Sequence, residues 1–280
     1  MFLLADAGGT NTRLALGKGS GILRDTFQRY TNADFDSFDE IVSTYLADRT
    51  PNALTACAFA IAGPVQDRSP RLSNLNWQID ADHLQRTLGA PVRLLNDLEA
   101  LGRALPSLTA KDVLQLSLGS GMDNGQMLAV GVGTGMNVCA VKAQPRSAPI
   151  VWACEYGEAP LPAPLQKAIE AAAVPLQGAT ITEHLFSGRG LAMCRERGID
   201  DLTYTHWLGQ LCATLSVQFL PLGGLYLAGG VSRAILKPER FATFQKGLSE
   251  TLPNWASEPP VSLITSDDAA LHGCLSLLTH

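Results

Sequence analysis

The chain has 280 residues, of which 46% are hydrophobic and 17% charged, with a net charge of -5. This composition is typical of a soluble globular protein with one large or two modest domains. The acidic balance and the lack of a basic stripe argue against nucleic-acid or membrane-surface binding. No run approaches the roughly 20 apolar residues of a membrane helix, and the N-terminal stretch lacks the positive start of a secretory signal. We therefore expect a cytoplasmic protein.

The six cysteines are dispersed, without a CxxC pair or a Cys/His cluster. This spacing argues against a zinc site and predicts reduced, mostly buried thiols. They are Cys57, Cys139, Cys154, Cys194, Cys212 and Cys274.

The first hundred residues alternate between strand and helix patterns, as in an α/β domain. Apolar runs predict strands at 2–7, 12–16, 21–30, 55–63 and 92–97. Helical spacing of apolar residues predicts helices at 36–49, 80–89 and 98–105. The first helix has Asp36 or Ser37 as its N-cap, and Gly89 closes the second.

The second half repeats this theme, starting with a strand, a glycine-threonine tip and a second strand over 126–141. Helices are expected at 163–173, 180–186, 188–198 and 205–220, and strands at 223–229 and 260–266. A closing helix is expected over 267–278, capped by Ser266 or Asp267. Gly131–Gly135 overlays Asp6–Thr10, which indicates two related α/β halves.

The opening stretch LLADAGGTNTRLAL places a carboxylate and two glycines at the tip of a predicted hairpin. Glycines let backbone N–H groups approach a phosphate, and a threonine hydroxyl adds a donor. Asp6 would repel a phosphate unless a cation lay between them, so Asp6 fits a Mg²⁺ partner. One such tip is little more than a turn, but a second tip and the pair Gly229–Gly230 after a strand favour nucleotide binding.

Two other nucleotide motifs fit poorly. GKGS at Gly17–Ser20 lacks the upstream glycine of a Walker A loop and is predicted to be a turn. GVGTG opens a strand, whereas the dinucleotide-binding pattern opens a helix.

The motifs DAGGTN, NDLEA, GVGTG and LAGGVSRAI, with AIAGPV and LSNLNW between them, resemble the bacterial glucokinase family. The resemblance covers essentially the whole chain, which looks shortened between about Gly198 and Thr205. It implies the two-domain α/β fold of actin-like ATPases and sugar kinases (ribonuclease H-like), with the active site in an interdomain cleft. The related repressor/kinase family carries a cysteine-rich zinc motif that this chain lacks.

The resemblance also implies roles for the glycine-rich loops. Asp6 and Thr10, with Gly8, Gly9 and Asn11, would face Mg²⁺ and the outer phosphates of ATP. Gly133, Thr134 and Gly135 would form the second phosphate loop. Gly229 and Gly230 would meet the adenosine end, at a helix N-terminus.

Asn96-Asp97 follows a predicted strand. An aspartate held at a strand end can accept the proton of a sugar hydroxyl during phosphoryl transfer, so Asp97 is the expected catalytic base and Asn96 a neighbouring sugar ligand. Alone, the pair would be read as a helix cap. With the phosphate loops present, catalysis is favoured.

The family motif Glu-Gly-Gly-His-Val-Asp corresponds here to CEYGEAPL. Glu155 and Gly157 match it, Tyr156 replaces the first glycine, Pro160 replaces the aspartate, and Glu158 stands where the sugar-contacting histidine is expected. Glu183 matches a further family glutamate. Glu155, Glu158 and Glu183 are therefore expected sugar ligands, and the carboxylate of Glu158 predicts a shifted sugar preference.

These features predict a small domain over 1–100, joined by a returning helix at 266–280, and a large domain over 101–265. The predicted activity is ATP-dependent phosphorylation of a hexose, foremost glucose at its 6-hydroxyl, with ATP and Mg²⁺ and without nucleic-acid or membrane partners. The alternatives are a kinase for another sugar, a non-catalytic sugar or nucleotide sensor, and a nicotinamide-dependent oxidoreductase. A homodimer is possible by resemblance.

Overall fold

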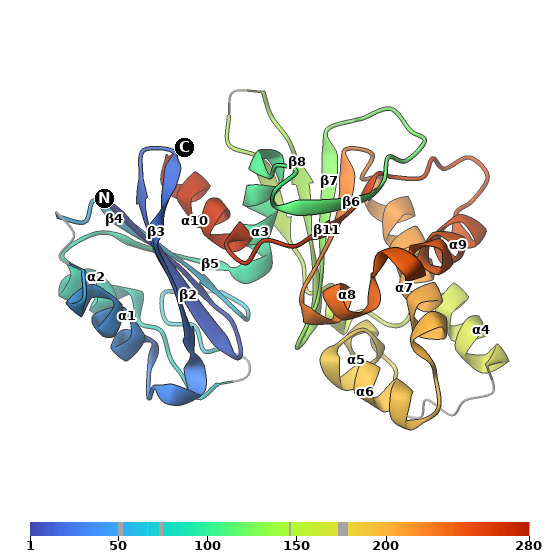
Figure 1. Ribbon diagram of the computed structural model, residues 1–280, viewed down its shortest axis with the longest axis horizontal. Coiled ribbons are helices and arrows are strands. Elements are labelled where there is room, and N and C mark those ends of the chain that lie inside the picture. The colour runs from blue at the N-terminus through green and yellow to red at the C-terminus, as the bar shows by residue number, and fades with distance from the viewer. Residues whose placement is uncertain (50–52, 66, 73–74, 146, 173–178, 280) are drawn as a thin grey trace. The chain divides into compact units, whose positions relative to one another are not determined.

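The computed structural model describes residues 1–49, 53–65, 67–72, 75–145, 147–172 and 179–279. Ser73 and Asn74 of LSNLNW, and the last residue of the helix predicted at 163–173, lie outside this part of the chain. The chain forms two compact α/β units (Figure 1). The first comprises Met1–Ser107, Pro145–Ile150 and Asp267–His280, and the second comprises Leu108–Gln144 and Val151–Ser266.

A five-stranded sheet forms the centre of the first unit, in the order β3-β2-β1-β4-β5. β1, β2 and β3 are an antiparallel meander, and β4 and β5 continue the sheet in parallel with β1. All five predicted strands are confirmed. GKGS is a turn only in its second half, because Gly17 and Lys18 end β2 and Gly19 and Ser20 form the turn to β3. Their bounds are β1 Phe2–Ala7, β2 Asn11–Lys18, β3 Gly21–Thr31, β4 Ala56–Ile61 and β5 Val92–Asn96.

Alternate residues of β1 pack on opposite faces of this sheet, as the two-residue period of a strand requires. Leu3 and Ala5 join the core beneath α1 (Phe38–Ala47) and α2 (Ala81–Leu88). Leu4 joins a second core with α3 (Asp97–Ala104) and α10 (Ala269–Thr279). Asp6 shares the parity of Leu4, so it belongs to the face that α3 and α10 cover.

The helix ends of this unit follow the predicted caps, with one exception. Ser37 accepts a hydrogen bond from the N–H of Glu40, and Gly89 closes α2 at φ 64°. The expected start of the last helix was wrong: α10 begins at Ala269, and the carbonyl of Asp268 accepts its first backbone bonds. The carboxylate of Asp267 instead pairs with arginines, as described below.

A six-stranded sheet forms the centre of the second unit, in the order β6-β11-β10-β7-β8-β9. β7 and β8 form the predicted antiparallel hairpin, and β10 and β11 run parallel to β7. The edge strands β6 and β9 were not predicted. The bounds are β6 Val113–Ser117, β7 Gln126–Val132, β8 Met136–Lys142, β9 Ile150–Ala153, β10 Gly224–Ala228 and β11 Val261–Ile264.

Helices pack against this sheet around α7, whose residues supply much of the core. α7 and α9 approach closely because each offers a glycine: a Cβ on Gly209 would lie 2.1 Å from the carbonyl of Phe244, and one on Gly247 would lie 2.1 Å from that of His206. The bounds are α4 Ala163–Ala171, α5 Thr182–Leu185, α6 Gly188–Glu196, α7 Asp201–Phe219, α8 Gly230–Ile235 and α9 Phe241–Thr251. Four short 3-10 helices, η1 to η4, are Asn32–Asp34, Leu105–Ser107, Tyr156–Glu158 and Pro238–Arg240.

All six cysteines are free thiols, and five of them are buried, as predicted. Within the described ranges, none of the helices combines the length and apolar character needed to cross a membrane.

Candidate active site

The first glycine-threonine tip joins β1 to β2 in the first unit. The N–H of Gly8 donates to the carbonyl of Asn11 at 3.0 Å and closes the turn. Gly8 and Gly9 are half-buried, and Thr10 is exposed at the apex. The tip therefore presents backbone and a hydroxyl to solvent, which is the surface that a phosphate needs.

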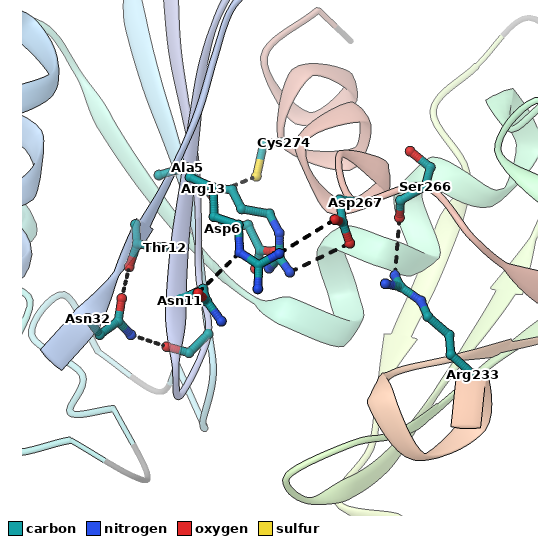
Figure 2. A network of polar contacts seen from close by, with 12 residues as sticks. Ala5, Asp6, Asn11, Thr12, Arg13, Asn32, Arg233, Ser266, Asp267 and Cys274 are labelled. Atoms are coloured by element: carbon teal, nitrogen blue, oxygen red, sulfur yellow. Dashed lines mark hydrogen bonds and ion pairs between the residues drawn. The ribbon is translucent and has the colours of Figure 1, made fainter. Parts of the chain in front are cut away.

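Asp6 lies at the foot of this tip and forms an ion pair with Arg13 across the hairpin (Figure 2). Its carboxylate is 3.1 Å from Arg13 Nη1, and its side chain is 14% exposed. Arg13 also faces Asp267 at 3.8 Å, and Arg29 approaches Asp267 at the same distance. Burial raises the pKa of Asp6, and the positive charge of Arg13 opposes this rise. Asp6 is thus a carboxylate held by Arg13, which faces it across the hairpin.

The strand register brings the first tip and the Asn96-Asp97 pair to one edge of the sheet. Ala7 on β1 is paired with Ile61 on β4, and Ile61 is paired with Asn96 on β5. Since neighbouring strands lie about 4.8 Å apart, the ends of β1 and β5 are about 10 Å apart. The predicted phosphate loop and the predicted base therefore share one edge, where the parallel strands β1, β4 and β5 end.

Asn96 is the N-cap of α3, as the cap reading of this pair anticipated. Its Oδ1 accepts from the N–H groups of Leu98 and Glu99, and its Nδ2 donates to the carbonyl of Gly63 at 2.9 Å. The carboxylate of Asp97, half-buried at the first position of α3, accepts from the N–H of Leu98 at 2.8 Å. The cap fixes the backbone at the point where Asp97 begins the helix.

The second tip, between β7 and β8, has the same character. The N–H of Gly133 donates to the carbonyl of Gly135 at 2.9 Å, and Thr134 is exposed. The next parallel strand, β10, ends beside it, because Ala228 is paired with Gly131. Gly229 has φ 94°, and a Cβ there would lie 2.3 Å from the carbonyl of Val132, so only glycine fits. Gly230, at the start of α8, is exposed.

Three glutamates gather beside the second tip. Glu183 on α5 accepts a hydrogen bond from the N–H of Met136 at 3.1 Å, and Glu155 accepts one from Asn137 Nδ2 at 2.9 Å. Burial raises the pKa of Glu155, and the negative charges of Glu158 and Glu183 raise it further. Glu158 is exposed on a 3-10 turn. The three expected sugar ligands therefore act on one another electrostatically.

Each unit thus gathers its own share of the predicted site residues. The first holds Asp6, Gly8, Gly9, Thr10, Asn11, Asn96 and Asp97. The second holds Gly133, Thr134, Gly135, Glu155, Glu158, Glu183, Gly229 and Gly230. Among the described residues, no group of three or more His, Cys, Asp or Glu side chains is arranged to hold a metal ion by itself.

The sequence analysis missed four polar residues that support these loops. Arg13 pairs with Asp6, Asp267 pairs with Arg13, Asn137 holds Glu155, and Asn32 contacts the first tip. Arg13 could have been found, since it faces Asp6 across a predicted hairpin. Asp267 reaches Arg13, and Asn32 reaches the tip, through tertiary packing, which local sequence does not show.

Solved glucokinases share the fold of this chain. A glucokinase structure from an Antarctic psychrotroph is similar at TM-score 0.76, with 22% identity and coverage of 99% of this chain and 98% of that one. A glucokinase of the ROK family from Streptomyces griseus, in complex with glucose and AMPPNP, is similar at TM-score 0.63 and 18% identity, with 99% and 98% covered.

The chain belongs to the glucokinase family, whose model matches residues 3–198 and 201–280. The gap between these two matched segments, residues 199–200, lies in the region that the sequence indicates is shortened. The glucokinase of Saccharophagus degradans is 26% identical over 325 residues, with 99% of this chain and 98% of that protein covered. The glucokinase of Sinorhizobium medicae is 25% identical over 305 residues, with 94% and 89% covered.

Proposed function

We propose that this chain transfers the γ-phosphoryl group of ATP to the 6-hydroxyl of glucose. Membership of the glucokinase family supports a hexose kinase. The observation that carries the assignment of residues is the strand register, which brings the end of β1, with Asp6 and its tip, to the same sheet edge as Asp97. A sensor would have no use for a base placed beside a phosphate loop.

Asp97 is the proposed base. As the bond between the γ-phosphorus and the bridging oxygen of ATP breaks, a bond forms from phosphorus to the sugar oxygen. The hydroxyl proton passes to the carboxylate of Asp97, and ADP leaves. Asn96 uses its oxygen and one N–H in the fold, so it has one N–H left for a sugar hydroxyl. Most of the rate enhancement comes from positioning and charge neutralisation.

Both glycine-threonine tips are proposed phosphate loops, and Gly229 and Gly230 are proposed to meet the adenosine end of the nucleotide. Magnesium is the proposed cation. Mg²⁺ keeps several waters and takes one or two carboxylates plus substrate phosphates, so a single carboxylate such as Asp6 fits it without an all-protein cage. When bound, the ion neutralises phosphate charge. Arg13 keeps the Asp6 carboxylate in place for that role.

A kinase for another sugar is the second candidate, because Glu158 stands where the family has histidine. An ionised carboxylate accepts hydrogen bonds and cannot donate them. Beside Glu155 and Glu183 it favours a substrate that brings donors or positive charge to this position. An amino sugar has that chemistry.

The test is ADP release from Mg-ATP across a panel of hexoses, amino sugars and N-acetyl sugars. A clear glucose signal supports the first candidate and makes Glu158 a tolerated variation. A signal with another sugar alone supports the second. No signal, with ATP still bound, contradicts both and favours a sensor, whereas absorbance changes with NAD(H) would revive the oxidoreductase reading.

A cytoplasmic location and assembly into a homodimer stay predictions. Sedimentation of the purified chain tests the second of these directly.

A further inference from the structure

Asn32 is a buried polar residue directly after β3, at the start of η1, and none of the motifs in the sequence contains it. It is 2% exposed, and an asparagine so deeply buried costs free energy unless its amide group is hydrogen-bonded. Its partners therefore indicate why the position is polar.

Two of these partners are carbonyls of the first glycine-threonine tip. Asn32 Nδ2 donates to the carbonyl of Gly8 at 2.8 Å, and the backbone N–H of Asn32 donates to the carbonyl of Thr10 at 2.9 Å (Figure 2). The Oδ1 atom accepts from the buried hydroxyl of Thr12 at 2.8 Å. A carbonyl can only accept, so the group that faces Gly8 has to be the NH₂ end of the amide. One residue thus holds carbonyls on both sides of Gly9.

Because the peptide group is planar, the orientation of the Gly8 carbonyl also fixes the direction of the Gly9 N–H. No cis peptide bond occurs in the described chain, and in a trans peptide the N–H points opposite to the C=O. The carbonyl of Gly8 points inward to Asn32, so the N–H of Gly9 points the other way. This donor is therefore directed away from the buried Asn32 side chain, and Gly9 itself is half-buried next to the exposed Thr10.

We propose that Asn32 is a positioning residue for nucleotide binding: it fixes the Gly8–Gly9 peptide so that the Gly9 N–H faces a phosphate oxygen of ATP. This rests on the proposed function, because it takes the first tip as a phosphate ligand. Without the Asn32 amide, the bond from the Gly8 N–H to Asn11 still closes the turn, but the Gly8 carbonyl loses the donor that orients it. Glycine on both sides imposes little preference of its own on the Gly8–Gly9 peptide. The Gly9 N–H would then face the phosphate for only part of the time.

A purely structural role makes a different prediction. If Asn32 served to join β2 to β3, its loss would lower stability and change the affinities for nucleotide and sugar alike. A positioning role therefore changes the ratio of nucleotide affinity to sugar affinity, whereas a structural role leaves that ratio unchanged. The control is a variant that loses a different hydrogen bond of the same network.

Asn32→Asp keeps the size of the side chain and its acceptor for Thr12, but it removes the donor to Gly8. Asn32→Ala removes the donor without adding charge, so that repulsion between a new carboxylate and phosphate is not mistaken for the effect. Thr12→Val is the control, because it loses one buried hydrogen bond of this network and keeps both bonds from Asn32 to the tip. Binding of Mg-AMPPNP is measured by calorimetry, KM for ATP and sugar by ADP release, and folding by circular dichroism.

We expect both Asn32 variants to bind Mg-AMPPNP about tenfold more weakly, the scale of one lost hydrogen bond, with a matching rise in KM for ATP. KM for the sugar should stay within about twofold, and Thr12→Val should stay within about twofold for both ligands. Nucleotide affinity that is unchanged in either folded Asn32 variant overturns the inference. So does an equal loss in Thr12→Val. A wild-type chain that binds Mg-AMPPNP but does not phosphorylate glucose overturns the proposed substrate and leaves this comparison valid.

Discussion

Asp97 is held by its own neighbours in the chain. Asn96 ends β5 and caps α3, so the backbone of Asp97 is fixed at the point where strand becomes helix. For Asp97→Asn we expect turnover to fall about a hundredfold or more, the scale of a lost positioned base, with Mg-AMPPNP binding nearly unchanged. Glu99→Gln is the matched control on the same helix, because Glu99 pairs with Arg103. Turnover of Asp97→Asn within a few-fold of wild type would remove Asp97 from its role.

Glu158 influences the proposed sugar site through charge. It raises the pKa of Glu155, which accepts stronger hydrogen bonds from hydroxyl groups when it is ionised than when it is protonated. Sugar binding should therefore weaken as pH falls through that raised pKa. Glu158→Gln removes one neighbouring negative charge, lowers the pKa of Glu155, and should move the acid limb of kcat/KM for the sugar to lower pH. Glu170→Gln, an exposed substitution on α4, is the control and should leave the acid limb at the same pH. If the acid limb also stays at the same pH in Glu158→Gln, the electrostatic coupling of Glu158 to Glu155 is contradicted.

Most of the proposed site residues could be named from the sequence, because glycine, threonine and a carboxylate at a hairpin tip have a local chemical reason to be there. Asp6 and Gly229 are examples. The roles of Asn32 and Asp267 could not be predicted, because Asn32 contacts the tip, and Asp267 contacts Arg13, from elements distant in sequence. The cap role of Asn96 was visible locally, whereas the ion pair of Asp6 with Arg13 needed the hairpin register.

At the level of elements, α9 shows why one helix was not predicted. Gly247 lies in its interior, and a glycine there weakens the helical pattern in the sequence. The structure requires this glycine, since a Cβ would meet the carbonyl of His206 on α7. The edge strands β6 and β9 were missed for another reason: neither has a buried residue, β6 interrupts its apolar residues with Gln115 and Ser117, and β9 has only four residues.

Gly247→Ala gives a test in which two effects have opposite signs. Alanine stabilises an isolated helix relative to glycine by about 0.5–1 kcal/mol. Against α7 the added methyl group overpacks the contact, so we expect a net loss of about 1–3 kcal/mol in the free energy of unfolding. Denaturant titration measures it, with the exposed Lys246→Ala as control. A stabilised Gly247→Ala would mean that α7 and α9 are less closely packed than described.

For the whole molecule, nucleotide and metal should act together on stability. A ligand that binds the folded chain at about 100 times its Kd adds about 2.7 kcal/mol. We expect Mg-ATP to raise Tm, and EDTA to remove most of that rise and to abolish turnover. In Asp6→Asn, the rise in Tm with Mg-ATP should differ little from the rise with ATP and EDTA. The exposed Asp34→Asn should behave as wild type. Equal Tm shifts with and without the metal would argue against Asp6 as a magnesium partner.

The return of α10 to the first unit has a consequence for how the chain is made. Ribosomes release a chain from its N-terminus, so β1 to β5 emerge long before Ala269–Thr279. Until then, the apolar face around Leu4 and Ala58 lacks the cover that Leu271 and Leu275 give it. The unit that is synthesised first is therefore completed last, and during synthesis its uncovered face is a natural target for chaperones.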